Sequence, residues 1–493
     1  MNRRRFLTAA MSLTGTGVSA EVLTSPIPKR RPDRIAGVSL ARALTERVEE
    51  AGLRGRVSYL IADALSGHVL AQRFSSRAMP PASTAKALTA AYALDRLGPA
   101  FRFSTELIAN GPIRDGQLQG DLCLVGSGDP LLSTDDLAGL AAELRALGVQ
   151  EVTGGFKIWS GALPHIWEID PAQPDHLRYS PSVSGLNLNF NRVRLGWAPG
   201  ANGYKLSLDA RTKRHIPPVS VIQARLSDRN LPVFDHVYDD QSQAERWSLA
   251  RSALNGAGAR WLPVRQSGDF AADVFRYFAG QQGIALPRAE RLNVRPNGAI
   301  LASHISQPLS EILRGLLRYS TNISAEAVGL RASLSEADIA RVEDLPASGA
   351  MMTRWAEQGL GFRDSALRDH SGLSGLNQVT ARDMVAALIS LAPQGGLYQV
   401  LPPIGLVDSS GVAEPFGLKA KTGTLNFVSC LAGYIEPPSG RVLCFAILTD
   451  APDRRANVAP EDREAPSGSA AWTRRSRIMQ YDLVRLAAGH ASV

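Results

Sequence analysis

Two strand hairpins at opposite ends of the chain constrain the fold more than any other feature. Apolar runs over 56–63 and 68–74 flank a Ser-Gly pair, and apolar runs over 425–435 and 441–449 flank a Pro-Pro-Ser-Gly turn. Turn residues between two such runs predict a β-hairpin. Helical patterns accompany both hairpins along the chain. We therefore expect one antiparallel sheet, flanked by helices, in a domain that an insertion splits in sequence.

The chain is long enough for several domains. Its 493 residues suggest about two to four of them, and 44% apolar with 20% charged residues excludes disordered, collagenous and coiled-coil classes. Strand and helix patterns between the hairpins indicate one or two inserted α/β or β-rich modules. The expected order is a leader over 1–20, a linker over 21–35, the first part of the split domain over 36–102, the inserted region over 103–282 and the second part over 283–493. The predicted fold class is therefore α/β (α+β).

The first 20 residues have the pattern of an export signal. Arg3, Arg4 and Arg5 precede a short apolar run that ends in small residues at Ala20, as in secretory signal peptides. The Arg-Arg-x-Phe-Leu start resembles the twin-arginine signal. No later stretch holds 18 apolar residues, so we expect no integral membrane span. These features predict a periplasmic protein that is exported by the twin-arginine route.

Charge and cysteine content argue against several kinds of partner and cofactor. The net charge is +8 without a Lys/Arg tract, so a nucleic-acid partner is not implied. Three cysteines are too few for a disulfide scaffold, and the histidines lack metal-ligand spacing, so we expect no metal and no cofactor. If the second hairpin pairs around its turn, Cys430 faces residue 446 or 447 rather than Cys444, which favours free buried thiols.

A serine and a lysine three residues apart form the first chemical motif. Ser83 and Lys86 lie where a loop enters an apolar helix predicted over 84–97. Positions i and i+3 share one helix face, so Lys86 can reach the Ser83 hydroxyl. Burial lowers the pKa of a lysine, and a pKa near roughly 7–8 would make Lys86 a usable base. By itself this motif is also compatible with a surface pair of side chains.

Two further motifs follow in a fixed order. Ser320-Thr321-Asn322 is the only Ser-x-Asn sequence, and Lys421-Thr422-Gly423 is the only Lys-Thr-Gly sequence, although only seven of the 54 basic residues are lysines. The second motif is predicted to lie just before an apolar strand, where Lys421 and Thr422 can hold a carboxylate. Gly423 permits close backbone approach, and the N–H of Thr424 can serve, with that of Ser83, as an oxyanion donor.

The three motifs and their flanks resemble a known family. The chain resembles the class C low-molecular-mass penicillin-binding proteins, the D-alanyl-D-alanine carboxypeptidase/endopeptidase family (peptidase family S13), over nearly all the mature sequence. The resemblance rests on Pro81-Ala82-Ser83-Thr84-Ala85-Lys86, Gly120-Asp121-Leu122, Gly128-Asp129-Pro130, Ser320-Thr321-Asn322, Asp369-His370-Ser371-Gly372-Leu373-Ser374 and Lys421-Thr422-Gly423-Thr424. It implies a serine β-lactamase/penicillin-binding transpeptidase-like domain with a central antiparallel sheet, interrupted by a large inserted region.

The resemblance also implies a reaction and a role for each motif residue. Ser83 would attack the penultimate D-alanine carbonyl of a peptidoglycan stem peptide and form an acyl-enzyme, and β-lactam antibiotics would acylate the same serine. The implied roles are proton acceptor for Lys86, proton relay for Ser320, orientation of the substrate amide for Asn322, and carboxylate binding for Lys421 and Thr422. Water would then release the acyl group.

Several readings remain open on sequence alone. A β-lactamase or esterase of the same superfamily is one alternative, and a peptidoglycan-binding scaffold with a disused site is another. The balance between carboxypeptidase and endopeptidase action is undetermined. Trp159 stands where related members carry an acidic residue, which leaves the preferred stem-peptide side chain open.

Two other polar segments are interpreted as loops. His370-Ser371-Gly372 competes weakly with Lys421-Thr422-Gly423 for the third motif. The alternating Asn187, Asn189 and Asn191 indicate a hydrogen-bonded turn rather than a glycan groove.

Overall fold

The computed structural model describes residues 39–239, 241–242, 244–334, 342–391 and 396–492. The predicted leader over 1–20 and the linker over 21–35 lie outside the described residues. Within the described ranges, no helix has the length and apolar character needed to cross a lipid bilayer.

The two hairpins join into one five-stranded antiparallel sheet, as the sequence predicts. The strand order is β17–β18–β19–β1–β2, with β1 (Arg56–Asp63) paired along its whole length with β19 (Leu443–Asp450). The other members are β2 (Val69–Arg73), β17 (Gly417–Leu425) and β18 (Val428–Glu436). Strands from both ends of the chain therefore build the sheet, and the domain is split in sequence.

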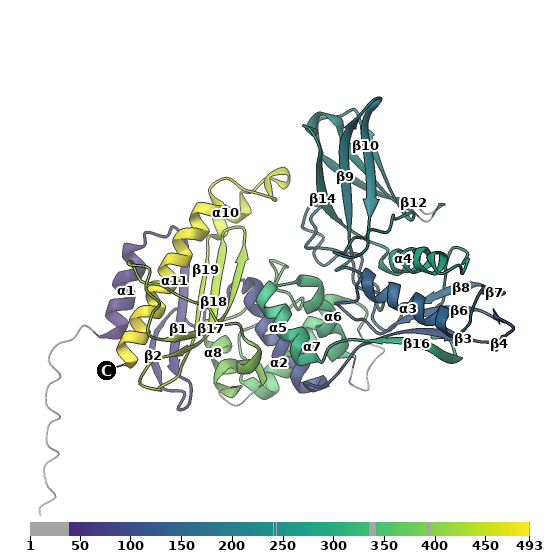
Figure 1. The fold of residues 1–493 in the computed structure, drawn as a ribbon. Coiled ribbons are helices and arrows are strands. Elements are labelled where there is room, and N and C mark those ends of the chain that lie inside the picture. The colour runs from purple at the N-terminus through teal and green to yellow at the C-terminus, as the bar shows by residue number, and fades with distance from the viewer. Residues whose placement is uncertain (1–38, 240, 243, 335–341, 392–395, 493) are drawn as a thin grey trace, which may run out of the picture. The chain divides into compact units, whose positions relative to one another are not determined.

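Helices cover both faces of this sheet (Figure 1). Alternate residues of a strand point to opposite faces. Tyr59 therefore packs in the core beneath α1 (Leu40–Glu50) and α11 (Ser469–Ala491), whereas Leu60 packs toward the helices on the other face. Burial on both faces explains why these strands read as continuous apolar runs rather than as alternating ones. The spacing of Trp472, Met479, Leu483 and Leu486 predicts one buried face for α11; the first three are buried, whereas Leu486 is 36% exposed, so the prediction is wrong there.

The second face of the sheet meets a helical lobe. Helix α2 (Ala85–Leu97) follows the short 3₁₀ turn η1 (Ala82–Thr84) and is buried from Ala85 to Ala93. The other helices of the lobe are α5 (Leu309–Tyr319), α6 (Asn322–Ser333), α7 (Leu345–Leu360), α8 (Ala381–Ser390) and α9 (Gly396–Val400). The Thr380 hydroxyl accepts the main-chain N–H of Asp383 at 2.9 Å and so caps the N-terminus of α8, as a threonine three residues before an aspartate predicts.

The inserted region holds a five-stranded mixed sheet, three smaller sheets and two helices around a separate core. Its helices are α3 (Thr134–Ala146) and α4 (Ser267–Gln281). Its strands are β3 (Ser104–Ala109), β4 (Ile113–Arg114), β5 (Gln117–Leu118), β6 (Leu122–Gly126), β7 (Glu151–Val152), β8 (Phe156–Trp159), β9 (Arg192–Gly200), β10 (Gly203–Asp209), β11 (Ile222–Ser227), β12 (Phe234–Asp239), β13 (Ala244–Ala250), β14 (Gly258–Pro263), β15 (Glu290–Arg291) and β16 (Ala299–Ile305).

The sequence pattern predicts that this region ends at residue 282, but the pairing of β15 and β16 extends it beyond that residue. Strand β15 pairs with β8, and β16 pairs antiparallel with β3. Strand β16 lies at the edge of its sheet and is largely exposed, so its sequence lacks a strong apolar pattern. We therefore propose that the inserted region ends near Ile305 and that the second part of the split domain begins with α5.

The cysteines are free and buried, as the sequence favours. In the second hairpin Cys430 lies opposite Leu448, one position beyond the predicted partner, and Cys444 lies opposite Tyr434. Burial raises the pKa of both the Cys430 and the Cys444 thiol to about 12. Both thiols therefore stay protonated and unreactive at neutral pH.

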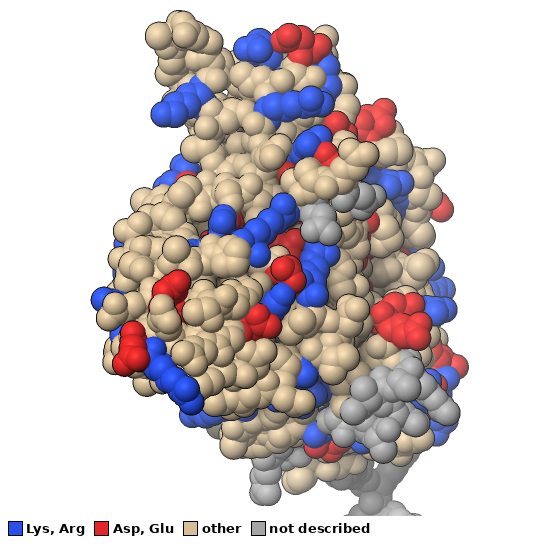
Figure 2. Space-filling view, turned by 90° about the vertical axis from the view of Figure 1, so that its right-hand side faces the viewer, with Lys and Arg blue, Asp and Glu red and all other residues tan. Residues whose placement is uncertain are grey.

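The face of the molecule drawn in Figure 2 carries basic and acidic side chains side by side. Neither sign forms a single large patch on that face. Opposite charges at short range largely cancel, so the field that this face sends into solvent is weak.

Candidate active site

The Ser83 hydroxyl lies beside the Lys86 amine, as the spacing predicts. Ser83 occupies the 3₁₀ turn ahead of α2, and Lys86 Nζ lies 2.9 Å from Ser83 Oγ. The preceding residue, Ala82, has a φ of 46°, in the left-handed region that non-glycine residues rarely adopt. A Cβ on Gly372 would lie 1.9 Å from the Ala82 carbonyl oxygen. The loop at Gly372 therefore packs directly against the turn that presents Ser83.

Lys86 is fully buried and has three polar neighbours. Besides Ser83 Oγ, its Nζ lies 2.8 Å from Asn322 Oδ1 and 2.7 Å from the Ser371 carbonyl oxygen. A neutral amine has two N–H groups and one lone pair. Because Asn322 Oδ1 and the Ser371 carbonyl can only accept, the two N–H groups go to them, and the lone pair is left to receive the Ser83 proton. The arrangement suits a general base.

Electrostatics favour the neutral form of Lys86. The pKa of Lys86 is lowered to about 7 as the net result of four effects: burial and the positive charge of Lys421 lower it, whereas Glu326 and Asp369 raise it. Among these effects burial is the largest. At neutral pH a substantial fraction of Lys86 is therefore uncharged, which a general base requires.

The loop over 369–374 belongs to this site, although the sequence analysis treated it only as a weak competitor for the third motif. Glu326 of α6 is fully buried and accepts the main-chain N–H groups of His370 and Ser371 at 2.9 and 2.8 Å. Asp369 accepts the main-chain N–H of Gly372 at 2.6 Å. These bonds fix the Ser371 carbonyl that faces Lys86. Sequence reasoning missed Glu326, because nothing in its local pattern distinguishes it from a solvent-facing helix residue.

His370 holds the same loop from behind. Its ring packs against Gly329 of α6, where a Cβ would lie 2.1 Å from His370 Cγ. Its Nε2 lies 2.7 Å from the Ser348 hydroxyl of α7. Burial lowers the pKa of His370 to about 3. This histidine is therefore neutral at physiological pH and links the loop to two helices.

Of the second motif, Asn322 belongs to the hydrogen-bond network around Lys86, whereas Ser320 does not. Asn322 begins α6, and its Nδ2 donates to the Tyr179 carbonyl of the inserted region at 2.9 Å. Ser320 ends α5 in a left-handed conformation with a φ of 58°. Its hydroxyl has no hydrogen-bond partner within the described part of the chain. The contact with Tyr179 shows that the inserted region helps to orient a motif residue, and no local sequence pattern predicts this contact.

The third motif lies inside β17 rather than before a strand, which corrects the sequence expectation. Strand β17 is an edge strand paired with β18. A Cβ on Gly423 would lie 2.7 Å from the Pro81 carbonyl oxygen and 3.0 Å from Ser83 N. Only a glycine therefore lets the strand approach the turn at Ser83 this closely. This approach brings Thr424 into the same cavity wall as Ser83.

Lys421 is buried beside this strand. Its side chain is almost inaccessible, at 2% exposure, and its Nζ donates to the Thr422 carbonyl at 2.8 Å. Burial lowers the pKa of Lys421 to about 8. Lys421 therefore stays mostly charged at neutral pH, and its charge acts on Lys86 across the site.

A cavity of about 920 Å³ opens beside Ser83. Its walls include Asn322 and Thr424, Tyr179 of the inserted region, and Arg477 of α11. The cavity therefore brings together parts of the chain that lie far apart in sequence. Within the described ranges, no group of three or more His, Cys, Asp or Glu side chains could hold a metal ion.

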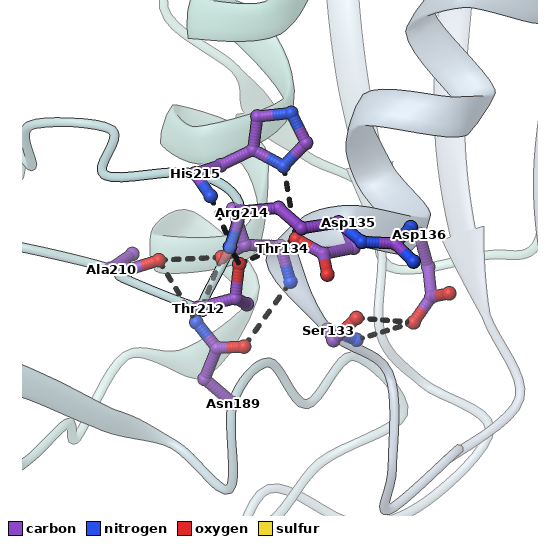
Figure 3. A network of polar contacts seen from close by, with 9 residues as sticks. All are labelled: Ser133, Thr134, Asp135, Asp136, Asn189, Ala210, Thr212, Arg214 and His215. Atoms are coloured by element: carbon purple, nitrogen blue, oxygen red, sulfur yellow. Dashed lines mark hydrogen bonds and ion pairs between the residues drawn. The ribbon is translucent and has the colours of Figure 1, made fainter.

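The three alternating asparagines build a turn, as the sequence favours. Asn187 Oδ1 accepts the N–H of Ser184, and Asn191 Oδ1 accepts that of Leu188. Figure 3 shows Asn189 directed toward the start of α3, where its side chain contacts Thr134 and the Ala210 carbonyl. The amide groups are thus used within the inserted region. In the same network His215 and Thr212 both contact Asp135.

Together these features place a serine hydroxyl beside a buried lysine amine, on a split domain with a large insertion. The model of the D-Ala-D-Ala carboxypeptidase 3 (S13) family matches residues 40–474. The chain belongs to this family, which confirms the resemblance drawn from the motifs.

Individual relatives agree with this assignment. The chain is 30% identical to the D-alanyl-D-alanine carboxypeptidase of Actinomadura sp. (strain R39) over 84% of this chain and 81% of that protein. It is 27% identical to the D-alanyl-D-alanine carboxypeptidase DacB of Haemophilus influenzae over 82% of this chain and 86% of that protein. The crystal structure of penicillin binding protein 4 (dacB) from H. influenzae matches with a TM-score of 0.72 and 22% identity, covering 90% of this chain and 99% of that one. This match confirms the penicillin-binding fold.

Proposed function

We propose that this chain hydrolyses D-alanyl-D-alanine peptides of peptidoglycan through an acyl-enzyme on Ser83. The single observation that carries the proposal is the buried Lys86 amine, with Ser83 Oγ, Asn322 Oδ1 and the Ser371 carbonyl around it. Membership of the S13 family supports the reaction class and the substrate class.

Acylation follows from the protons that these groups hold. Neutral Lys86 takes the Ser83 hydroxyl proton while Ser83 Oγ attacks the penultimate D-alanine carbonyl. The resulting oxyanion is stabilised by the main-chain N–H groups of Ser83 and Thr424. When the C–N bond breaks, the proton on Lys86 passes to the departing amine, with the Ser320 hydroxyl as relay. Hydrolysis of the ester by water restores Ser83 and releases the shortened peptide.

The remaining motif residues orient the substrate. Asn322 holds the peptide amide beside Ser83, and Lys421 with Thr422 supplies positive charge and a hydroxyl on the side of the terminal carboxylate. β-Lactams present the same carboxylate and a strained amide, so they are expected to acylate Ser83 and to inhibit the enzyme. A crystal structure of the H. influenzae relative in complex with a β-lactam is consistent with that expectation.

Both the cellular location and the leaving group belong to the proposal. The Arg3-Arg4 start supports export to the periplasm by the twin-arginine route, where peptidoglycan is found. Replacement of Arg3 and Arg4 by Lys should block export, so that the precursor stays inside the cell. When the leaving group is free D-alanine, the reaction is a carboxypeptidase step. When the leaving group is the amine of a cross-linked peptide, the reaction is an endopeptidase step.

The deciding experiment is intact mass spectrometry of the protein after incubation with a penicillin. The wild type should gain the mass of one penicilloyl group, and Ser83→Ala should gain none. Release of D-alanine from a D-alanyl-D-alanine peptide should disappear in the same variant. An adduct that persists in Ser83→Ala would overturn the assignment of the nucleophile, and rapid loss of the adduct with turnover of penicillin would indicate a β-lactamase instead.

A further inference from the structure

The cations around the site differ in their exposure, and besides the two lysines the cavity wall includes Arg455, Arg474 and Arg477. Lys86 and Lys421 are buried, at 0% and 2% exposure. Arg477 of α11 is exposed and lines the same cavity as Ser83 and Thr424. Among the residues that the structure describes, no carboxylate pairs with Arg477. An exposed, unpaired cation in the wall of a catalytic cavity is available to an anionic part of a substrate.

A hydrogen bond to Thr424 orients the guanidinium of Arg477. Arg477 Nη2 donates to Thr424 Oγ1 at 2.9 Å. A threonine hydroxyl that accepts a bond from a guanidinium still has its own hydrogen to donate. The guanidinium lies on one side of the oxygen, so the hydrogen points away from it. Thr424 lines the cavity, so a carboxylate there could receive that hydrogen and a guanidinium N–H together.

The position of Arg477 is fixed by buried polar contacts on either side of it in the helix. Gln480 Nε2 donates to the Ser429 carbonyl at 2.9 Å, and Ser476 Oγ lies 2.7 Å from Thr449 Oγ1. Ser429 is the cross-strand partner of Thr424 in the pairing of β17 with β18. Helix α11 is therefore held in register over the strand pair that carries Thr424, so the base of the Arg477 side chain is fixed.

Lys421 is less suited to meet a ligand directly. Its Nζ donates to the Thr422 carbonyl of its own strand, and the side chain is 2% exposed. Its positive charge acts on Lys86 from within the protein. Of the two exposed arginines in the cavity wall, Arg474 and Arg477, it is Arg477 that contacts this strand, at Thr424.

We propose that Arg477 is a specificity residue that recognises, together with Thr424, the terminal carboxylate of the substrate. The proposal rests on the proposed function, since it concerns the same cavity and the same D-alanyl peptide. It divides two tasks between the cations: Arg477 binds and selects the carboxylate at the surface, and Lys421 supplies a fixed positive charge behind the strand.

The test compares a free-acid substrate with its uncharged twin. The substrates are a D-alanyl-D-alanine peptide and its C-terminal methyl ester, which share the scissile amide. The variants are Arg477→Ala and Arg477→Lys, and the matched control is Arg475→Ala, an exposed arginine of the same helix outside the cavity wall. The measured quantity is the ratio of kcat/KM for acid and ester.

In Arg477→Ala the acid-to-ester ratio should fall roughly three- to tenfold, the range for a partly exposed ionic hydrogen bond. In Arg477→Lys the acid-to-ester ratio should fall less than in Arg477→Ala. In Arg475→Ala the ratio should equal that of the wild type. A ratio in Arg477→Ala equal to that of the wild type, or an equal fall in Arg475→Ala, would overturn the proposal.

Penicillin labelling of the wild type separates this failure from failure of the proposed function. A wild type that gains the penicilloyl mass and cleaves the acid peptide, while Arg477→Ala keeps the wild-type ratio, refutes the role of Arg477 alone. A wild type that gains no adduct and cleaves neither peptide refutes the proposed function, and the role of Arg477 with it.

Discussion

The two walls of the active site are built in opposite ways. On the helical wall, Lys86, Asn322 and the loop at Ser371 form a closed hydrogen-bond network with a fully buried amine. On the strand wall, Thr424 and Arg477 are exposed at the cavity. Burial on the first wall lowers the pKa of a lysine so that it can accept a proton. Exposure on the second wall lets a charged ligand enter and leave. Under the functions that we propose, proton transfer takes place in the buried environment and carboxylate recognition in the exposed one.

The largest loss of activity is expected from substitutions on the helical wall. Ser83→Ala and Lys86→Ala should each lower kcat by roughly a thousandfold or more, and the double variant should lose little further, because the pair acts as one catalytic unit. The measurement is the steady-state rate on a D-alanyl-D-alanine peptide. Lys86→Arg is the control: it keeps a cation that cannot lose its proton, so it should be as inactive as Lys86→Ala. Activity in Lys86→Arg would contradict a base role.

The next largest effect is expected from Lys421 on the strand wall. Lys421→Ala should slow acylation by a free-carboxylate peptide roughly ten- to a hundredfold, since it removes the fixed positive charge behind the strand. The methyl ester should lose less. Loss of the positive charge should also raise the pKa of Lys86, so the acid limb of the pH–rate profile should move to higher pH. Equal losses for acid and ester would show that Lys421 serves only the proton network.

Substitution of Glu326 should displace the acid limb of the pH–rate profile in the opposite direction. Glu326→Gln removes a neighbour that raises the pKa of Lys86, so the acid limb should move to lower pH. The rate at its optimum should fall roughly tenfold, because a Gln side chain can accept only one of the two main-chain N–H groups that the Glu326 oxygens accept. Glu357→Gln, on the exposed side of α7, is the matched control and should change neither. A fall in rate without a displaced limb would assign Glu326 a structural role alone.

The smallest effect concerns the wild type as pH changes. Lys86, whose pKa is about 7, must be neutral to accept a proton, so kcat/KM should rise with pH through that value. Lys421, whose pKa is about 8, loses its charge above that value, so kcat/KM should then decline for the free acid. We expect a narrow bell-shaped profile with changes of a few-fold across each limb, measured with a D-alanyl-D-alanine peptide. A flat profile between pH 6 and 9 would be inconsistent with both assignments.

Much of the fold and half of the site could be predicted from local patterns. The hairpins follow from apolar runs around turn residues, and the reach of Lys86 to Ser83 follows from the geometry of one helical turn. The inserted region was harder to delimit, because β16 is an exposed edge strand with little apolar pattern. The placement of Lys421 inside β17 was also missed, since an edge strand beside an active site need not read as apolar.

The sequence by itself determined the motif residues, their order and the family. Only the tertiary structure decided which groups meet them: the Ser371 carbonyl and Glu326 at Lys86, Tyr179 at Asn322, and Arg477 at Thr424. Lys86 and Ser371 are 285 residues apart in sequence. Burial, and with it the pKa of each lysine, is set by neighbours that chain folding brings together across such separations. Periodicity records only neighbours within a few residues, so it cannot report which lysine is buried to accept a proton or which cation stays exposed to meet a substrate.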